Sequence, residues 1–332
     1  MSGLLNEKLD SGNVPFGPAA NETLDQTSGG PPRARRGAGH CQCVSQTSEH
    51  MSTHAELAGR VAVVTGATRQ AGIGAAIARE LVAAGAAVFI AHFRDYDRQQ
   101  TWGIAPGEPE SILAALGASA AGTEIDLSAP SAAAVLFDRA ISRFGHVDIL
   151  VNNAAHWERG GITEVSAAQL DRHYAVNLRA AVLLSGEFVR RRGPEVGGRI
   201  INITSGQGHG PMPGELAYAV TKAGLDALTL SLSAGLVESG VAVNAIDPGP
   251  TDTGWIPDDL RATLVAASAA GKIGTPQEVA AVVRLLSGDA AASVTGRIIR
   301  LQSNGVVDNL MTELANRRLH QSAAGAITSS LG

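Results

Sequence analysis

A serine, a tyrosine and a lysine stand in this chain at spacings that suit proton transfer. Ser205 follows residues 200–204, whose apolar and β-branched side chains predict a short buried strand with the serine at its carboxyl end. Tyr218 and Lys222 lie in a segment with helical periodicity, from residue 217 to about residue 236. Because they are four residues apart, a helix would place both side chains on one face.

These residue types can interconvert a carbonyl and an alcohol. A tyrosine phenol is a weak acid, with a pKa of about 10, and we expect the ammonium of Lys222 to lower the pKa of Tyr218 by stabilising the phenolate. The hydroxyl of Ser205 would then hold a substrate carbonyl in register for proton transfer. An isolated tyrosine–lysine pair is more often an exposed pair on a helix, and only the rest of the chain favours the catalytic interpretation.

Composition excludes several classes of protein. The 332 residues are 45% hydrophobic, which predicts one sizeable core with tails. A net charge of −5 with 17% charged residues gives no basic stripe, so we expect neither nucleic acid nor an anionic membrane surface as partner. Apolar runs end well before the roughly 20 residues that span a bilayer. With only Cys41 and Cys43, no disulfide framework is expected, which favours a reducing, cytoplasmic location.

The two ends of the chain differ from its middle. Residues 1–54 are rich in Gly, Ser, Pro, Asn and Thr without periodicity, which predicts a disordered tail. They hold no apolar signal segment, and Met51 is an alternative start, so a natural tail and a start-site artefact both stay open. The spacing of His40, Cys41, Cys43 and His50 fits no structural zinc pattern, and no metal is expected. Residues 55–310 form the predicted domain and residues 311–332 a C-terminal tail.

The domain opens with a strand, a glycine-rich turn and a helix. Residues 61–64 are continuously apolar, the turn runs from Thr65 to Gly74, and the helix continues to residue 84. Glycines let the backbone approach a pyrophosphate that rests on the helix N-terminus, so this order is typical of dinucleotide binding. Further strands are predicted at residues 87–91, 122–127, 147–153, 241–246 and 296–301, alternating with helices. The fold class is therefore α/β, a doubly wound (Rossmann) parallel sheet of about seven strands with helices on both faces.

Polar residues follow the later strands, at the edge of the sheet where ligands bind. Residues 152–155 end the fourth predicted strand, and residues 247–253 follow the sixth. Asn177 lies inside a long predicted helix over residues 167–190, where a solvated position or a satisfied core amide is the usual explanation. Its agreement with the other signals favours a role in the site.

From residue 57 to residue 309 the chain resembles a short-chain dehydrogenase/reductase, closest to the 3-oxoacyl-[acyl-carrier-protein] reductase-like branch. The family's TGxxxGxG turn is similar to residues 65–74, its NNAG to residues 152–155, and its helix asparagine to Asn177. Its serine, tyrosine and lysine match Ser205, Tyr218 and Lys222 at the usual spacings. The chain departs from the pattern in a turn two residues longer, NNAA in place of NNAG, and an apparent inserted loop over residues 95–110.

The resemblance implies an NAD(P)(H)-dependent oxidoreductase that acts on a small-molecule carbonyl or alcohol, with Tyr218 as general acid and base. It further implies that Lys222 also binds the nicotinamide ribose, that Ser205 polarises the substrate oxygen, and that Asn177 anchors a water linking Lys222 to solvent. Members are commonly homo-oligomers, tetramers or dimers. A non-catalytic dinucleotide-binding sensor or scaffold is the alternative, although it would be expected to lose part of the Asn177, Ser205, Tyr218 and Lys222 set.

The residues expected to contact the cofactor come from the glycine turn, the strand ends and the helix of the tyrosine. They are Thr65, Gly66, Arg69, Gly72, Ile73, Gly74, Arg94, Asp126, Leu127, Asn153, Ala154, Ala155, Tyr218, Lys222, Pro248, Gly249, Thr251 and Thr253. Arg69 and Arg94 together could clamp a 2′-phosphate, so NADP(H) is the expected preference with NAD(H) possible. The alternatives are that both arginines are solvated, or that Asp95 faces the ribose.

The predicted substrate pocket is apolar. Residues 206–215 and 254–271, including Trp255 and Ile256, should form its walls, and they carry few charges. This composition favours a hydrophobic or acyl-type carbonyl, such as a 3-oxoacyl group, over a small dianion.

Overall fold

A computed structural model of the chain describes residues 55–192, 197–206, 210–268 and 270–301. Within these ranges a seven-stranded sheet has the order β3-β2-β1-β4-β5-β6-β7, and every neighbouring pair is parallel. The predicted doubly wound fold is confirmed. The predicted tails over residues 1–54 and 311–332, the early cysteines and the domain end at residue 310 lie outside the described residues.

The strands are short and mostly buried on both faces, as in parallel sheets that helices cover. They are β1 Val61–Thr65, β2 Ala87–His92, β3 Ala120–Glu124, β4 Ile149–Asn152, β5 Arg199–Ile203, β6 Ala242–Asp247 and β7 Ile298–Arg300. The prediction for the third strand was displaced, because β3 pairs with β2 from Ala120 to Glu124. Residues 125–127 therefore pass the end of the sheet and belong to a loop.

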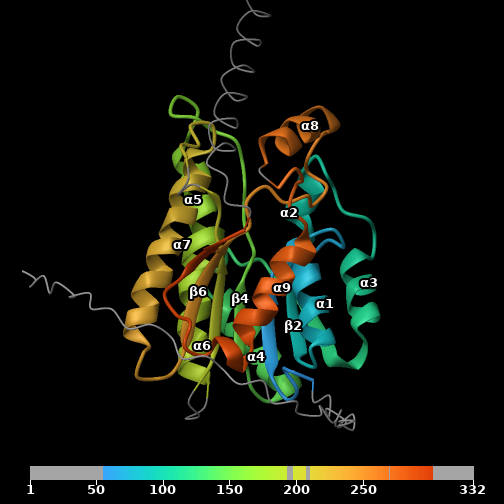
Figure 1. Cartoon of the computed structure of the whole chain (residues 1–332), viewed down its shortest axis with the longest axis vertical. Coiled ribbons are helices and arrows are strands. Elements are labelled where there is room, and N and C mark those ends of the chain that lie inside the picture. The colour runs from blue at the N-terminus through green and yellow to red at the C-terminus, as the bar shows by residue number, and fades with distance from the viewer. Residues whose placement is uncertain (1–54, 193–196, 207–209, 269, 302–332) are drawn as a thin grey trace, which may run out of the picture. The chain divides into compact units, whose positions relative to one another are not determined.

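Helices cover both faces of the sheet (Figure 1). They are α1 Ile73–Ala83, α2 Arg94–Gln99, α3 Glu108–Leu116, α4 Ala132–Phe144, α5 Ala167–His173, α6 Ala180–Arg191, α7 Leu216–Gly235, α8 Asp258–Ala267 and α9 Pro276–Ser287. Strand side chains alternate between two cores. Ala62 and Val64 pack with α1 and α9, whereas Val61 and Val63 pack with α4 and α6.

The predicted long helix over residues 167–190 is confirmed, with a change of geometry in its middle. Helices α5 and α6 are joined by a π-helical turn at Tyr174–Arg179, and helical backbone angles continue across both junctions. Such wide turns are rare and occur often at functional sites. Asn177 lies inside this turn.

The strand order reverses at β1, which has β2 on one side and β4 on the other. In open α/β sheets a crevice forms at such a point, beyond the carboxyl ends of the strands. The segment taken as an inserted loop enters this region as helix α2 followed by the start of α3. No helix among the described residues is long and apolar enough to cross a membrane.

Candidate active site

A cavity of about 1300 Å³ lies at the carboxyl ends of the strands. The loops after β1, β2, β3, β4, β5 and β6 all contribute to its wall. The three tryptophans of the chain, Trp102, Trp157 and Trp255, line it. Fourteen predicted cofactor contacts also line it: Gly66, Arg69, Gly72, Ile73, Asp126, Leu127, Asn153, Ala154, Ala155, Tyr218, Pro248, Gly249, Thr251 and Thr253.

The glycine turn brings backbone close to backbone at the mouth of this cavity. Gly66 has a φ of 72°, and a Cβ there would lie 2.7 Å from the Cα of Ala154. A Cβ on Gly74 would lie 2.5 Å from the Gly66 carbonyl oxygen. Gly72 and Ile73, at the start of α1, line the cavity, and the first turn of α1 holds no acidic residue. This cradle fits the pyrophosphate of a dinucleotide, because amide groups and the helix dipole favour negative charge there.

Thr65 and Asn153 hold the ends of β1 and β4 together. The Thr65 hydroxyl accepts hydrogen bonds from the amides of Asn153 (3.0 Å) and Ala154 (3.1 Å) and donates to the Val151 carbonyl (3.2 Å). The Asn153 amide group donates to the carbonyls of Thr65 (2.8 Å) and Gly66 (3.1 Å). Thr65 and Gly74 themselves do not line the cavity, so they shape the glycine turn from behind.

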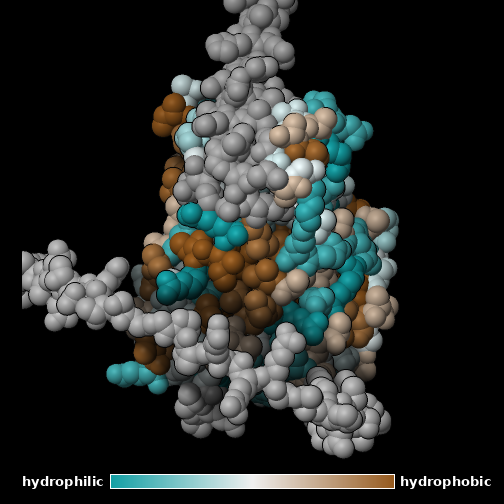
Figure 2. All heavy atoms as spheres, in the orientation of Figure 1, coloured by the Kyte–Doolittle hydropathy of each residue, from teal (hydrophilic) through white to brown (hydrophobic). Residues whose placement is uncertain are grey.

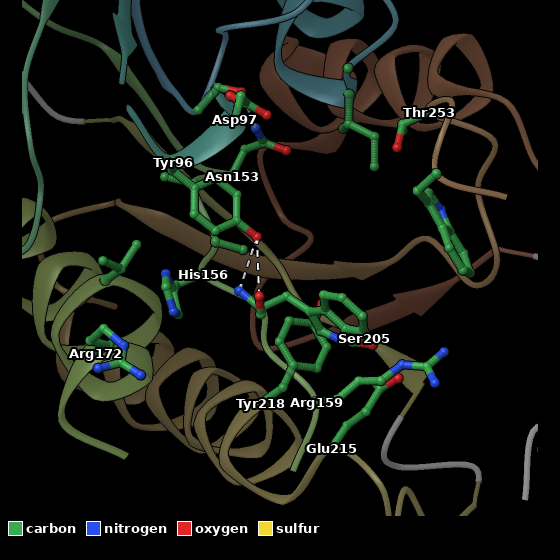
Figure 3. A pocket seen from close by; sticks show the side chains of 18 of the residues that line it. Tyr96, Asp97, Asn153, His156, Arg159, Arg172, Ser205, Glu215, Tyr218 and Thr253 are labelled. Atoms are coloured by element: carbon green, nitrogen blue, oxygen red, sulfur yellow. Dashed lines mark hydrogen bonds between the residues drawn. The ribbon is translucent and has the colours of Figure 1, made fainter. Parts of the chain in front are cut away.

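Ser205 and Tyr218 meet at the floor of the cavity, as Figure 3 shows. Burial raises the pKa of the Tyr218 phenol, and its hydrogen bond with Ser205 acts in the opposite direction. The expected net lowering of the Tyr218 pKa is not found, because burial outweighs the groups that oppose it. The phenol therefore stays protonated, which suits a group that gives a proton to a carbonyl oxygen.

Lys222 lies behind the tyrosine and not in the cavity lining. It is 1% exposed, its Nζ donates to the Ile203 carbonyl (2.8 Å), and this nitrogen is 5.6 Å from the centroid of the Tyr218 ring. Burial lowers the Lys222 pKa to about 8, while Asp226 and Asp247 raise it. The ammonium thus faces the ring of the tyrosine and has no direct contact with its hydroxyl.

Asn177 ties the loop after β4 to helix α7. Its Oδ1 accepts from the His156 amide (2.6 Å), and its Nδ2 donates to the His156 carbonyl (2.9 Å) and to the Thr221 hydroxyl (3.0 Å). Asn177 is 1% exposed and does not line the cavity. Because Thr221 lies beside Lys222 in α7, Asn177 fixes the distance between this helix and the cavity wall.

Arg69 connects three segments of the cavity wall through its side chain. Its Nε lies 3.1 Å from Asp97 Oδ1, its Nη1 donates to the Thr253 carbonyl (2.9 Å), and its guanidinium carbon lies 5.3 Å from the centroid of Trp102. The Trp102 indole donates to the same oxygen of Asp97 (3.0 Å). Burial raises the Asp97 pKa, with Trp102 and then Arg69 lowering it. Sequence reasoning missed Asp97 and Trp102, although an Asp and a Trp in an inserted segment beside a dinucleotide turn were a usable signal.

The structure does not bring Arg94 to the cavity. Its guanidinium pairs with Glu110 and Glu124, and it is absent from the cavity lining. The hydrogen bond to Glu110 is the first cause that raises the Arg94 pKa. The predicted clamp of Arg69 with Arg94 is therefore not assembled, because two carboxylates near the outer edge of the sheet hold Arg94.

An aromatic and charged wall faces Tyr218 from the loop after β4 and from α2. The Tyr96 hydroxyl accepts from the Trp157 amide (3.1 Å) and donates to its carbonyl (3.5 Å), the dashed lines of Figure 3. Burial raises the Tyr96 pKa to about 12. Arg172 makes two bonds of 2.9 Å to Glu158, and they are the first cause that lowers the Glu158 pKa to about 2. His156 Nε2 lies 2.7 Å from the same carboxylate.

The walls predicted from residues 206–215 and 254–271 make up only part of the pocket, and a charged wall adjoins them. Arg159, Glu164, Arg172 and Glu215 all line the cavity. Three of them come from the segment between β4 and α6, which sequence reasoning treated only as a turn and a helix.

Comparison with known proteins agrees with the fold. The family model described as enoyl-(acyl carrier protein) reductase matches residues 66–303. An uncharacterized oxidoreductase YjdA of Bacillus subtilis is 40% identical over 242 residues, 72% of this chain and 94% of that protein. The 3-oxoacyl-[acyl-carrier-protein] reductase FabG of Escherichia coli is 33% identical over 248 residues, 73% of this chain and 96% of that protein.

A solved short-chain dehydrogenase of Burkholderia cenocepacia, in complex with NADP, has 31% sequence identity and a TM-score of 0.68. The alignment covers 75% of this chain and 99% of that one. The chain belongs to the short-chain dehydrogenase/reductase family, and it is an oxidoreductase of that family.

Proposed function

We propose that the chain interconverts a carbonyl and a secondary alcohol with a nicotinamide dinucleotide, and that Tyr218 transfers the proton. The observation that carries this proposal is the meeting of Ser205 and Tyr218 at the floor of a cavity that also contains the glycine cradle. When bound, the nicotinamide would supply or take up the hydride. All other steps fall to the chain's own side chains.

Ser205 and Tyr218 would hold the substrate oxygen between two hydroxyl groups. In the reductive direction the neutral phenol donates its proton to this oxygen, and in the oxidative direction it takes the proton back. Negative charge that develops on the phenol lies beside the Lys222 ammonium, whose Nζ is 5.6 Å from the ring centroid and would stabilise it. Asn177 supports this arrangement by fixing α7 against the loop after β4.

The proposed cofactor preference is NADP(H), with Arg69 as the contact for the 2′-phosphate. Arg69 lines the cavity, and a guanidinium suits phosphate oxygens; a bound phosphate would compete with Asp97 and the Thr253 carbonyl for its Nε and Nη1. Asp97 would repel a phosphate when ionised, but its raised pKa reduces that cost. The complex of the Burkholderia relative with NADP supports the same cofactor.

Two arginine variants test this preference. We expect wild type to use NADPH at least about tenfold better than NADH in kcat/KM, and Arg69→Ala to remove most of that difference, since a charged hydrogen bond contributes about 1.5–3 kcal/mol. Arg94→Ala is the matched control and should leave the ratio unchanged, because Arg94 is held by Glu110 and Glu124. Equal use of both cofactors by wild type would remove Arg69 from the proposed site.

We also propose that the chain forms a homo-oligomer through the face of α5, α6 and α7. Large apolar side chains are exposed there, with Val220 65%, Leu230 52% and Tyr174 50% accessible. Figure 2 shows a further gathering of hydrophobic side chains over the strands between α7 and α9. Patches of this kind commonly mark protein interfaces. Light scattering should give a dimer or tetramer for wild type and a smaller species for Val220→Glu; a monomeric wild type contradicts the proposal.

The substrate proposed from the pocket is a carbonyl compound with an apolar body, a class that includes 3-oxoacyl thioesters. Nicotinamide absorbance during turnover of a ketone panel tests the activity. The panel should hold apolar ketones, a 3-oxoacyl thioester and ketones with a carboxylate. Cofactor binding can be followed separately through tryptophan fluorescence, because all three tryptophans line the cavity. Binding of the cofactor without turnover of any panel member would instead identify a non-catalytic dinucleotide-binding sensor.

A further inference from the structure

The loop after β4 is fixed against the start of the catalytic helix at Gly160. The Gly160 amide donates to the Gly214 carbonyl (2.8 Å), and the Leu216 amide donates to the Gly160 carbonyl (3.1 Å). Gly160 and Glu215 thereby form an isolated parallel β-bridge. A Cβ on Gly160 would lie 2.7 Å from the Gln169 side chain, which itself donates to the Arg159 carbonyl. The backbone at Arg159 is thereby held close to α7.

This anchoring places a guanidinium at the substrate end of the cavity. Arg159 lines the cavity and is exposed to it, and Figure 3 shows its side chain next to Glu215, near Ser205 and Tyr218. Its charge opposes the rise that burial causes in the Glu215 pKa. Among the described residues, no carboxylate oxygen lies within 4.0 Å of the Arg159 guanidinium, so no ion pair neutralises it.

The other charged side chains of this wall either have a hydrogen-bond or ion-pair partner or have a pKa shifted toward the neutral form. Arg172 is held by two hydrogen bonds to Glu158, which also contacts His156. Burial is the first cause that acts on the Glu215 carboxyl and raises its pKa, with Trp157 and Arg159 opposing it. Glu164 accepts a hydrogen bond from the Gly161 amide of its own loop (3.1 Å). Among the cationic side chains of this wall that the structure describes, His156 and Arg172 have a carboxylate partner, and Arg159 is left to face an anionic ligand beside Ser205 and Tyr218.

We propose that the natural substrate carries a carboxylate in addition to its carbonyl, and that Arg159 binds this carboxylate while Ser205 and Tyr218 hold the reacting oxygen. A guanidinium matches a carboxylate through two parallel hydrogen bonds, so it fixes orientation as well as charge. The aromatic side chains of Trp157 and Tyr96, which line the same cavity, would cover the apolar body that joins the two groups. This inference rests on the proposed oxidoreductase function.

Matched acid and ester probes test the inference. Two ketones, 4-oxocyclohexanecarboxylate and 5-oxohexanoate, would each be compared with its methyl ester, both as substrates and as ligands followed by tryptophan fluorescence. We expect the better acid to exceed its ester at least about tenfold in kcat/KM and in affinity, the size of a charged hydrogen bond that the ester cannot make. Arg159→Gln should abolish this difference by raising KM for the acid while leaving the ester unchanged, and Arg159→Lys should restore part of it.

Arg190→Gln is the charge-matched control, because Arg190 lies in α6, pairs with Glu187 and does not line the cavity. It should leave the preference for the acid intact. The inference is overturned if wild type prefers neither acid over its ester, or if Arg159→Gln lowers kcat/KM for the acid and for the ester equally. In both cases, turnover of neutral ketones would leave the proposed function standing. Absence of turnover across the whole panel overturns the proposed function instead, and the fluorescence titration then still decides whether Arg159 selects an anion.

Discussion

Lys222 should lower the stability of the folded chain, so its replacement by methionine should stabilise the protein. Its side chain is 1% exposed, and burial lowers its pKa from 10.5 to about 8. At pH 7 the group is nevertheless charged in both the folded and the unfolded chain. A depression of this size means that the charged form costs about 3 kcal/mol on folding.

The expected gain is smaller than this cost, because the substitution also removes the hydrogen bond from Lys222 to the Ile203 carbonyl (2.8 Å). A hydrogen bond from a charged donor contributes about 1.5–3 kcal/mol. We therefore expect Lys222→Met to raise the free energy of unfolding at pH 7 by up to about 1.5 kcal/mol, which corresponds to an increase in Tm of up to about 3–6 °C.

The stability difference between wild type and Lys222→Met should depend on pH. Between the folded pKa of about 8 and the unfolded value of 10.5, the unfolded chain binds more protons at this site, so the stability of wild type rises with pH. The methionine variant has no such rise. Its advantage should be complete below pH 8, should shrink above it, and should become a deficit of about 1 kcal/mol where only the lost hydrogen bond remains.

Urea unfolding of wild type and variant, without cofactor and at several pH values from about 7 to about 10.5, measures this difference. Lys272→Met is the control, because the Lys272 side chain is 57% exposed and pairs with Glu278 on the surface. It should change stability by less than about 0.5 kcal/mol. A Lys222→Met protein that is less stable at pH 7, or a difference that stays constant across the pH range, would refute the reasoning.

Two further predictions concern the frame of the site. Gly74→Ala should destabilise the chain by about 1–3 kcal/mol and weaken cofactor binding, because its Cβ would lie 2.5 Å from the Gly66 carbonyl oxygen. Gly235→Ala is the control, because a Cβ there meets nothing within 4 Å. Urea unfolding and a cofactor titration should show no loss of stability or of cofactor affinity in this control. Asn177→Leu should lower the free energy of unfolding by about 2 kcal/mol or more and reduce kcat, because the buried amide and carbonyl of His156 lose their partner. An unchanged Tm in Asn177→Leu would contradict its bracing role.

The parts of the structure that depend on short stretches of chain could be predicted from the sequence. The four-residue spacing of Tyr218 and Lys222 and the glycine turn after β1 rest on local geometry, and both are found as expected. The parallel sheet with helices on both faces follows from the alternation of strands with helices. The end of the third strand was misplaced because pairing with β2, and not its own composition, decides where β3 stops.

Contacts between distant segments could not be predicted in the same way. The guanidinium and the position of Arg94 after β2 suit a phosphate contact. Glu110 and Glu124 pair with Arg94 because α3 and β3 pack beside β2, which the local sequence does not reveal. Arg159 joins the site because Gly160 pairs with the start of α7. The raised pKa of Tyr218 depends on burial, which the spacing of two residues does not reveal.

The central claim is that the Tyr218 hydroxyl transfers the proton, and Tyr218→Phe tests it most directly. This change removes one oxygen and keeps the ring that packs beside Lys222. With the best ketone of the panel, kcat should fall by about 100-fold or more, the usual size of a lost general acid, while the dissociation constant of the cofactor stays within about twofold by tryptophan fluorescence. A phenylalanine variant that keeps more than about a tenth of the wild-type kcat loses less than about 1.4 kcal/mol of transition-state stabilisation, and that result would contradict the assigned role.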